Sequence, residues 1–248
     1  MRKFGLIGFP LSHSFSPDYF NNKFQQLGTD AVYNPFEIPT INHLNELINN
    51  NPFLEGLNVT IPFKESVIPF LNELSIEANE IAAVNCIKIE NRNQKPYLIG
   101  YNTDIIGFEK SFIPLLKPHH KKALILGNGG AAKAVRYVLK KLTIPFISVV
   151  RNNKLEDEIH YSDINAEVID AYNIIINTTP LGTYPDIEEC PDIPYDFLNE
   201  SHLLYDLIYN PSESLFLKKG KLQKAEIKNG YEMLIIQAEE SWKIWNHN

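Results

Sequence analysis

A glycine-rich turn between two apolar segments is the first place where this sequence could do chemistry. Apolar residues at 123–126 predict a short buried strand, and apolar residues at helical spacing up to 142 predict a helix after the turn. The turn between them contains Gly127, Asn128, Gly129, Gly130 and Ala131. Glycines allow a tight bend and a close approach of a ligand, and free N–H groups at the helix start would face a diphosphate. This G-x-G-x-x-A turn predicts a dinucleotide site, with an ordinary tight turn as the alternative.

The residues after the next apolar segment, 145–150, indicate which dinucleotide fits. Arg151 and Asn152 follow that segment, with Asn153 and Lys154 next. A site for NAD has an Asp or Glu there, which binds the ribose 2′-hydroxyl. Cationic and amide side chains would instead pair with a 2′-phosphate. The sequence therefore favours NADP over NAD, and a solvated basic turn is the structural alternative.

Lys64 and Asp104 are the candidates for proton transfer. A nicotinamide domain joined to a second α/β domain predicts hydride transfer across the cleft between the two, and reduction of a carbonyl also needs a proton. Lys64 follows a predicted strand at 57–61 and stands beside apolar Pro62 and Phe63, while Asp104 begins a predicted helix. A surface lysine and a helix-capping aspartate are the structural alternatives.

Strands and helices alternate along the chain and must position these residues. The alternation predicts an α/β protein with a parallel sheet, whose ligand groups lie beyond the strand ends. Ser16 is expected to cap the first helix, a short helix is expected after Lys64, and a last helix carries an apolar stripe from Tyr231 to Trp245. A domain boundary is expected near residues 102–120. Strands are predicted at 3–8, 31–38, 57–61, 84–90, 96–101, 123–126, 145–150, 174–180 and 203–209.

The composition excludes several classes of function. A net charge of −7 without a basic block argues against nucleic acid or an anionic membrane surface as a partner. No apolar run is long enough for a membrane span or an export signal. Two distant cysteines make no disulfide framework, which fits a reduced, cytoplasmic setting, and seven scattered histidines indicate no metal site.

Eight segments together resemble the shikimate dehydrogenase family over nearly the whole chain. They are GFPLSHSFSP, NVTIPFKE, AAVNCI, GYNTDIIGF, GNGGAA, INTTPLGTYP, YDLIYNP and NGYEMLIIQA, in this order. The resemblance implies NADPH-dependent reduction of 3-dehydroshikimate to shikimate, a step in chorismate and aromatic amino acid biosynthesis. It also implies a substrate-binding domain over 1–103, completed by a C-terminal helix at about 231–248, and a Rossmann-type NADP-binding domain over 104–230.

The resemblance further implies roles for single residues. Lys64 would donate and accept the proton, paired with Asp104, and both would contact ring hydroxyls of the substrate. The rest of the substrate site would comprise Ser14, Ser16, Thr60, Asn85, Tyr209 and Gln237. The cofactor would be held by Gly127, Asn128, Gly129, Gly130, Ala131, Arg151, Asn152, Leu207 and Gly230. The only partner expected beyond small molecules is a second copy of the chain, in a homodimer.

Three departures from the family pattern stand out. Val150-Arg151-Asn152 replaces an Asn-Arg-Thr sequence, Ser214 replaces a threonine, and Asn128 replaces an alanine. The first leaves open how strictly NADP is preferred. The alternatives are therefore a quinate/shikimate dehydrogenase that uses NAD or both cofactors and, more remotely, a non-catalytic NADP-binding regulator.

Overall fold

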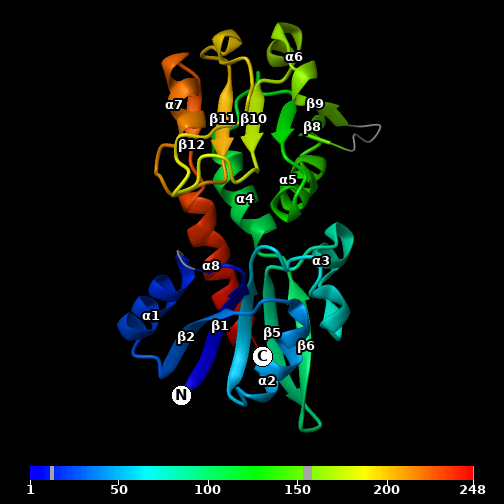
Figure 1. Ribbon diagram of the computed structural model, residues 1–248, viewed down its shortest axis with the longest axis vertical. Helices are drawn as coiled ribbons and strands as arrows, with labels where there is room; N and C mark the ends of the chain where they lie inside the picture. The colour runs from blue at the N-terminus through cyan, green and yellow to red at the C-terminus, as the bar shows by residue number, and fades with distance from the viewer. Residues whose placement is uncertain (12–13, 153–157, 248) are drawn as a thin grey trace. The chain divides into compact units, whose positions relative to one another are not determined.

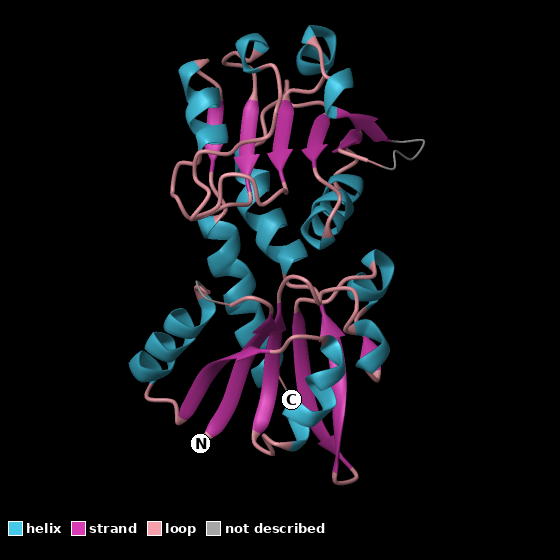
Figure 2. Ribbon diagram, in the orientation of Figure 1, coloured by secondary structure: helices cyan, strands magenta, loops and turns pink. Residues whose placement is uncertain are grey.

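The structure, a computed structural model, describes residues 1–11, 14–152 and 158–247 (Figure 1). The chain divides into two compact units. The first comprises Met1–Thr103 and Ala238–Asn248, and the second comprises Asp104–Gln237. Each unit contains one sheet, and each is described by itself below (Figure 2).

The first unit is built on a six-stranded mixed sheet. Its strands, in spatial order, are β2 (Ala31–Glu37), β1 (Arg2–Gly8), β3 (Leu54–Val59), β5 (Cys86–Arg92), β6 (Lys95–Tyr101) and β4 (Glu73–Leu74). β1 runs parallel to both of its neighbours, whereas β5 runs antiparallel to β3 and β6. β5 and β6 form the predicted hairpin, which turns at Asn93 and Gln94 in the left-handed conformation.

Helix α1 (Ser16–Leu27) forms where the sequence predicts a helix. Pro17 lies in its first turn, and Gly28 ends it with a φ of 62°. The predicted capping role of Ser16 is wrong, because Ser16 is already helical and Phe15 precedes it without a side-chain cap. The buried Ser16 instead lies beside the phenol of Tyr33.

Two apolar clusters complete the first unit. Phe4, Phe20, Phe24 and Trp245 form the centre of one cluster, in which the rings of Phe4 and Trp245 stack with centroids 4.9 Å apart. The other cluster includes Leu57 and contains mainly aliphatic side chains. Its helical neighbours are α2 (Leu44–Asn49), α3 (Ile76–Ile81) and short 3₁₀ helices at Ile41–His43 and Ile68–Phe70.

The second unit is built on a six-stranded sheet in which every pairing is parallel. Its strands, in spatial order, are β12 (Glu226–Lys228), β11 (Leu203–Asp206), β10 (Ile174–Asn177), β7 (Ala123–Leu126), β8 (Phe146–Val150) and β9 (Glu158–His160). The segment from β7 through α5 to β8 forms the strand, glycine turn, helix and second strand that the sequence predicts. With its mostly parallel sheets and alternating helices, the chain confirms the predicted α/β class and the Rossmann-type arrangement of the second unit.

Helices surround the second sheet and complete its core. They are α4 (Asp104–Phe112), α5 (Gly130–Lys141), α6 (Ala166–Ala171), α7 (Leu215–Leu222) and the first part of α8 (Tyr231–Asn246), with 3₁₀ turns at Ile113–Leu115, Tyr161–Asp163 and Tyr195–Phe197. α8 is divided between the units after Gln237. The sequence-based boundary near 231 instead assigned the whole helix to the first domain.

Several strands end earlier than the sequence predicts, including β10, which ends at Asn177 instead of residue 180. β3 ends at Val59 instead of residue 61, because Pro62 lacks the N–H that a further ladder bond would need. β11 ends at Asp206 instead of residue 209, because the side chain of Asp206 accepts the N–H of Ile208. The helix expected after Lys64 is also wrong: residues 64–67 form turns, and only the 3₁₀ helix at Ile68–Phe70 follows.

Candidate functional site

In the first unit, the segment after β3 carries Thr60 and Lys64. Thr60 lies directly beyond the strand, where its N–H still donates to the carbonyl of Ile7 at 2.9 Å. Lys64 is half-buried in a turn, and its carbonyl accepts the N–H of Val84 at 2.7 Å. This bond ties the Lys64 turn to the segment that leads into Asn85. Both predicted residues thus follow the carboxyl end of a parallel strand.

Asn85 is held in one orientation by Thr103. The side-chain oxygen of the buried Asn85 accepts the Thr103 N–H at 2.6 Å and the Thr103 hydroxyl at 3.2 Å. A backbone N–H can only donate, so the atom that faces it must be the amide oxygen. The opposite side of the amide, the NH₂ group, is therefore the side that could donate to a ligand oxygen.

The two predicted serines lie at the start of α1. Ser14 is half-buried, and its hydroxyl donates to the carbonyl of Leu11 at 3.1 Å. Ser16 lies beside Tyr33. Complete burial raises the pKa of the Tyr33 phenol well above its usual value, and the neighbouring Ser16 hydroxyl partly offsets this rise. Hydroxyl groups at a helix start are suited to binding a carboxylate.

Three further predicted residues belong to the second unit. Asp104 is the buried first residue of α4, and Tyr209 is half-buried in the loop after β11. Gln237 is buried on α8, and its amide donates to the carbonyl of Leu234 at 2.9 Å. α4 and α8 approach closely, because a Cβ on Gly107 would lie 3.2 Å from the Cβ of Gln237. Asp104 lies one helical turn before Gly107, on the same face of α4.

The predicted pair of Lys64 and Asp104 is divided between the units. Lys64 belongs to the first unit, and Asp104 begins the second. Their pairing in catalysis therefore stays a prediction.

The glycine turn has the shape expected of a phosphate-binding loop. Gly127 has a φ of 106°, and a Cβ there would lie 2.8 Å from the hydroxyl of Thr178, so both conformation and space require glycine. Gly129 is the N-cap of α5 and has extended backbone angles that any residue could adopt. A Cβ on Gly129 would meet no atom within 4 Å. The space beside Gly129, at the helix N-terminus, is open.

Asn128 has a side-chain role that sequence analysis did not predict. Its amide nitrogen donates to Glu158 of β9 at 2.7 Å, and its oxygen accepts from Arg136 of α5 at 2.6 Å. The side chain thus fixes the turn between a strand and a helix, which leaves backbone groups as the means by which Asn128 could bind a phosphate. Gly130 begins α5, and Ala131 is half-buried in its first turn.

Arg151 and Asn152 are exposed directly after β8. The positive charge of Arg151 partly offsets the burial that raises the pKa of Tyr161 to about 12, so the guanidinium lies near that phenol. Asn153 and Lys154, which were expected to add to this basic turn, lie outside the described residues.

Leu207 and Gly230 are brought together in the second unit. A Cβ on Gly230 would overlap the backbone carbonyl of Leu207, so only glycine allows this close approach. The N–H of Gly230 donates to the carbonyl of Ile208 at 2.9 Å, and the N–H of Leu207 donates to that of Asn177 at 3.0 Å. These two predicted cofactor residues are therefore neighbours.

Asp206 is a buried carboxylate beside Leu207 that sequence analysis did not single out. It accepts hydrogen bonds from the Asn177 amide at 3.0 Å, from the N–H of Ile208 at 3.1 Å, and from the hydroxyl of Ser214. Its side chain is completely buried, and burial raises its pKa from 3.8 to about 6. The signal in the sequence was a single acidic residue that ends the apolar segment LLY.

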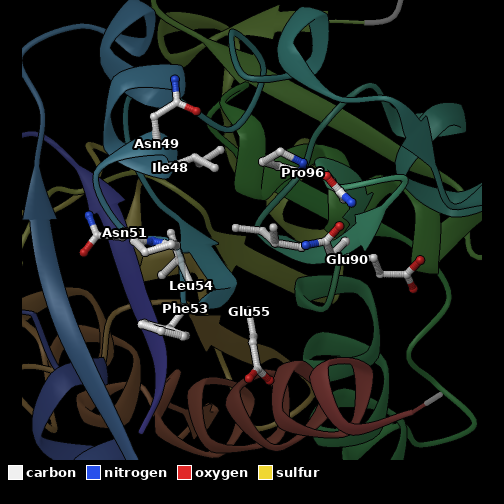
Figure 3. Close-up of a pocket in the computed structure, with 12 residues that line it drawn as sticks. Ile48, Asn49, Asn51, Phe53, Leu54, Glu55, Glu90 and Pro96 are labelled. Atoms are coloured by element: carbon white, nitrogen blue, oxygen red, sulfur yellow. The ribbon is translucent and has the colours of Figure 1, made fainter.

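A surface hollow of about 410 Å³ lies elsewhere on the first unit (Figure 3). Asn51, Phe53, Leu54 and Glu55 border it at the start of β3, and Glu90 and Pro96 border it on the hairpin. Thr60 follows the other end of β3, about 20 Å away for a strand of this length. None of the predicted site residues lines this hollow.

Neither a metal centre nor a membrane span is found in the described part of the chain. The described residues contain no group of three or more His, Cys, Asp or Glu side chains that could hold a metal ion. Within the same residues, no helix combines the length and apolar character needed to cross a membrane.

Comparison with known proteins identifies the family. The model of the shikimate dehydrogenase substrate binding domain matches residues 6–87. The NADP(+) shikimate dehydrogenases of Methanococcus maripaludis strain C6 and Clostridium beijerinckii are 40% and 39% identical to this chain. The alignments cover 97% and 99% of this chain, and 90% and 92% of these relatives.

A solved structure agrees over the same length. The shikimate 5-dehydrogenase of Thermus thermophilus, in complex with NADP(H) and shikimate, superimposes with a TM-score of 0.85 at 26% identity. The superposition covers 99% of this chain and 94% of that one. From its sequence, its fold and these similarities, this chain belongs to the shikimate dehydrogenase family.

Proposed function

We propose that this protein is an NADP-dependent shikimate dehydrogenase that reversibly reduces 3-dehydroshikimate to shikimate. The observation that carries the proposal is the similarity over 97% of the chain to enzymes of that name. The two units also supply, separately, the groups that the reaction needs. The product would be used to make chorismate and the aromatic amino acids.

The residues around the glycine turn fit a bound dinucleotide. The open space beside Gly129 could hold a diphosphate, which the N–H groups at the start of α5 would bind. Arg151 and Asn152 would bind the 2′-phosphate, and Leu207 and Gly230 would flank the nicotinamide. Bound NADPH would supply a hydride to the substrate carbonyl.

The polar residues of the first unit fit a small hydroxylated acid. The hydroxyls of Ser14 and Ser16 would bind the substrate carboxylate, and Thr60 and the NH₂ group of Asn85 would bind ring oxygens. Tyr209 and Gln237 of the second unit would complete the positioning of the substrate.

Lys64 would transfer the proton. As an ammonium group it would donate a proton to the ketone oxygen during reduction, and as an amine it would accept that proton during oxidation of shikimate. Asp104 would orient this ammonium group and contact a ring hydroxyl. The half-burial of Lys64 and its ties to the Asn85 segment support this role, because a proton donor must be held near the reacting atom.

The direct test is the loss of NADPH absorbance after 3-dehydroshikimate is added to the purified protein. We expect turnover with NADPH, and slower turnover with NADH at equal concentrations. Oxidation of shikimate and of quinate with each cofactor separates this proposal from a quinate/shikimate dehydrogenase. A protein that binds NADP but turns over none of these compounds would instead be a regulator.

We further propose a cytoplasmic location and a homodimer. Cys86 and Cys190 are both free thiols, and they belong to different units, which fits a reducing compartment. Sedimentation at micromolar concentration tests the dimer, and a mass of one chain would contradict it.

A further inference from the structure

A chain of buried hydrogen bonds links five segments of the first unit. The Tyr33 hydroxyl on β2 donates to the side-chain oxygen of Asn58 on β3 at 2.8 Å. The nitrogen of the same amide donates to the Ser241 hydroxyl on α8 at 2.9 Å and to the carbonyl of Asn85 at 3.2 Å. The hydroxyls of Ser241 and Thr103 lie 3.3 Å apart.

The chemistry of the groups fixes the direction of the bonds made by the two amides. The amide nitrogen of Asn58 must face the Asn85 carbonyl, so its oxygen must accept from Tyr33. Thr103 has one hydroxyl hydrogen, and the side-chain oxygen of Asn85 can only accept it. The Ser241 hydroxyl accepts from Asn58, lies 3.3 Å from the Thr103 hydroxyl and also lies beside the Cys86 thiol.

The two ends of this chain are residues with proposed substrate contacts. At one end Ser16 lies beside Tyr33 and lowers the pKa of its phenol, and at the other Thr103 holds the amide of Asn85. Asn58 and Ser241 lie between them, completely or almost completely buried. A buried polar network of this kind adds little net stability over apolar packing, but it specifies orientation when every member is satisfied.

We propose that Ser241 and Asn58 are positioning residues for the substrate, which act through Thr103 on the amide of Asn85. This inference rests on the function proposed above. Ser241 is the member of the chain that comes from α8. The terminal helix thus contributes to substrate binding through a residue that would not itself contact the substrate.

The test is Ser241→Ala, with Ser111→Ala as its matched control. Both serines are buried, and the Ser111 hydroxyl also bonds another hydroxyl, that of Tyr205, at 2.7 Å in the second unit. We expect Ser241→Ala to raise the KM for shikimate about tenfold, as for the loss of one well-oriented hydrogen bond, with the KM for NADP changed less than twofold. Ser111→Ala should leave the KM for shikimate within twofold of wild type.

A double-mutant cycle tests whether Ser241 acts through Thr103. Thr103→Val removes the hydroxyl, keeps the side-chain shape and retains the backbone N–H that bonds Asn85. If the two act in one chain, the double variant should have a KM for shikimate no higher than the worse single variant. Multiplied effects would overturn the proposed route.

Two outcomes separate this inference from the proposed function. A wild-type protein without activity on shikimate would refute the function itself. An active wild type, together with a Ser241→Ala variant whose KM for shikimate is unchanged, would refute only the positioning role. If Ser241→Ala does not fold, Thr103→Val must still raise the KM for shikimate and not that for NADP, or the inference fails.

Discussion

The buried carboxylate of Asp206 should make the second unit less stable as the pH rises. Folding raises its pKa from 3.8 to about 6, so the folded state favours the protonated form. The contribution of Asp206 to the free energy of unfolding is greatest below pH 3.8 and declines as the pH rises through 6. The difference between the two pKa values is equivalent to about 3 kcal/mol, of which about 2 kcal/mol is lost between pH 4 and pH 7.

Asp206→Asn isolates this effect from the other titrating groups. The amide keeps an oxygen that can accept from Asn177 and Ile208, and it cannot ionise. Loss of the acceptor for Ser214 changes stability by an amount that does not depend on pH. The stability of the variant relative to wild type should therefore rise by about 2 kcal/mol from pH 4 to pH 7.

Urea unfolding followed by far-ultraviolet circular dichroism, at pH steps across this range, gives the measurement. Asp170→Asn, which changes an exposed carboxyl of α6 in the same unit, is the control and should follow the wild-type curve. If the difference between the Asp206→Asn variant and wild type stays constant with pH, the carboxyl of Asp206 does not titrate as its burial requires.

Three further substitutions test the proposed site. Lys64→Ala should lower kcat by about 10² to 10⁴ with little change in KM, as for a lost proton-transfer group, in steady-state assays with shikimate. Arg151→Ala should raise the KM for NADP far more than that for NAD, because only NADP carries the 2′-phosphate. Gly129→Ala should raise the KM for NADP without changing the melting temperature, because the added methyl meets open space in the protein.

The substitutions of Gly129 and Arg151 each have a contrast within the chain. Gly127→Ala should lower the melting temperature as well, because its left-handed backbone and Thr178 both oppose a side chain. Arg92→Ala removes an exposed cation of the first unit and should change the KM for neither NADP nor NAD. Near-normal turnover after Lys64→Ala would remove that lysine from the mechanism. If Arg151→Ala raised the KM for NADP and the KM for NAD equally, Arg151 would not bind the 2′-phosphate.

Local patterns were enough to predict much of the fold. The strand at Ala123–Leu126, the glycine turn and α5 follow from an apolar run, glycines and helical periodicity that lie next to one another in sequence. Gly28 likewise ended α1 where its left-handed backbone requires glycine. Such features depend on neighbours a few residues away.

Other features could not be predicted because distant residues decide the local structure. Ser16 looks like a helix cap, but it lies inside α1 and beside Tyr33, a residue of β2. Thr103 lies 18 residues after Asn85, so no local sequence pattern predicts the hydrogen bond between them. Asp206 lies in a segment that the sequence predicts as a strand, but its unusual pKa results from its burial in the folded protein. Sequence could name the proposed site residues, but not the hydrogen bonds that orient them.

The division of α8 has a consequence for the order in which the protein matures. During synthesis, β1 and α1 leave the ribosome early, but Trp245, which stacks on Phe4 and donates to the carbonyl of Ile87, is made near the end of the described chain. The second unit is complete once Gln237 has been translated. Both units are thus completed only by α8, and the aromatic residues of β1 and α1 lack their Trp245 partner for most of synthesis, so the nascent first unit needs protection from aggregation.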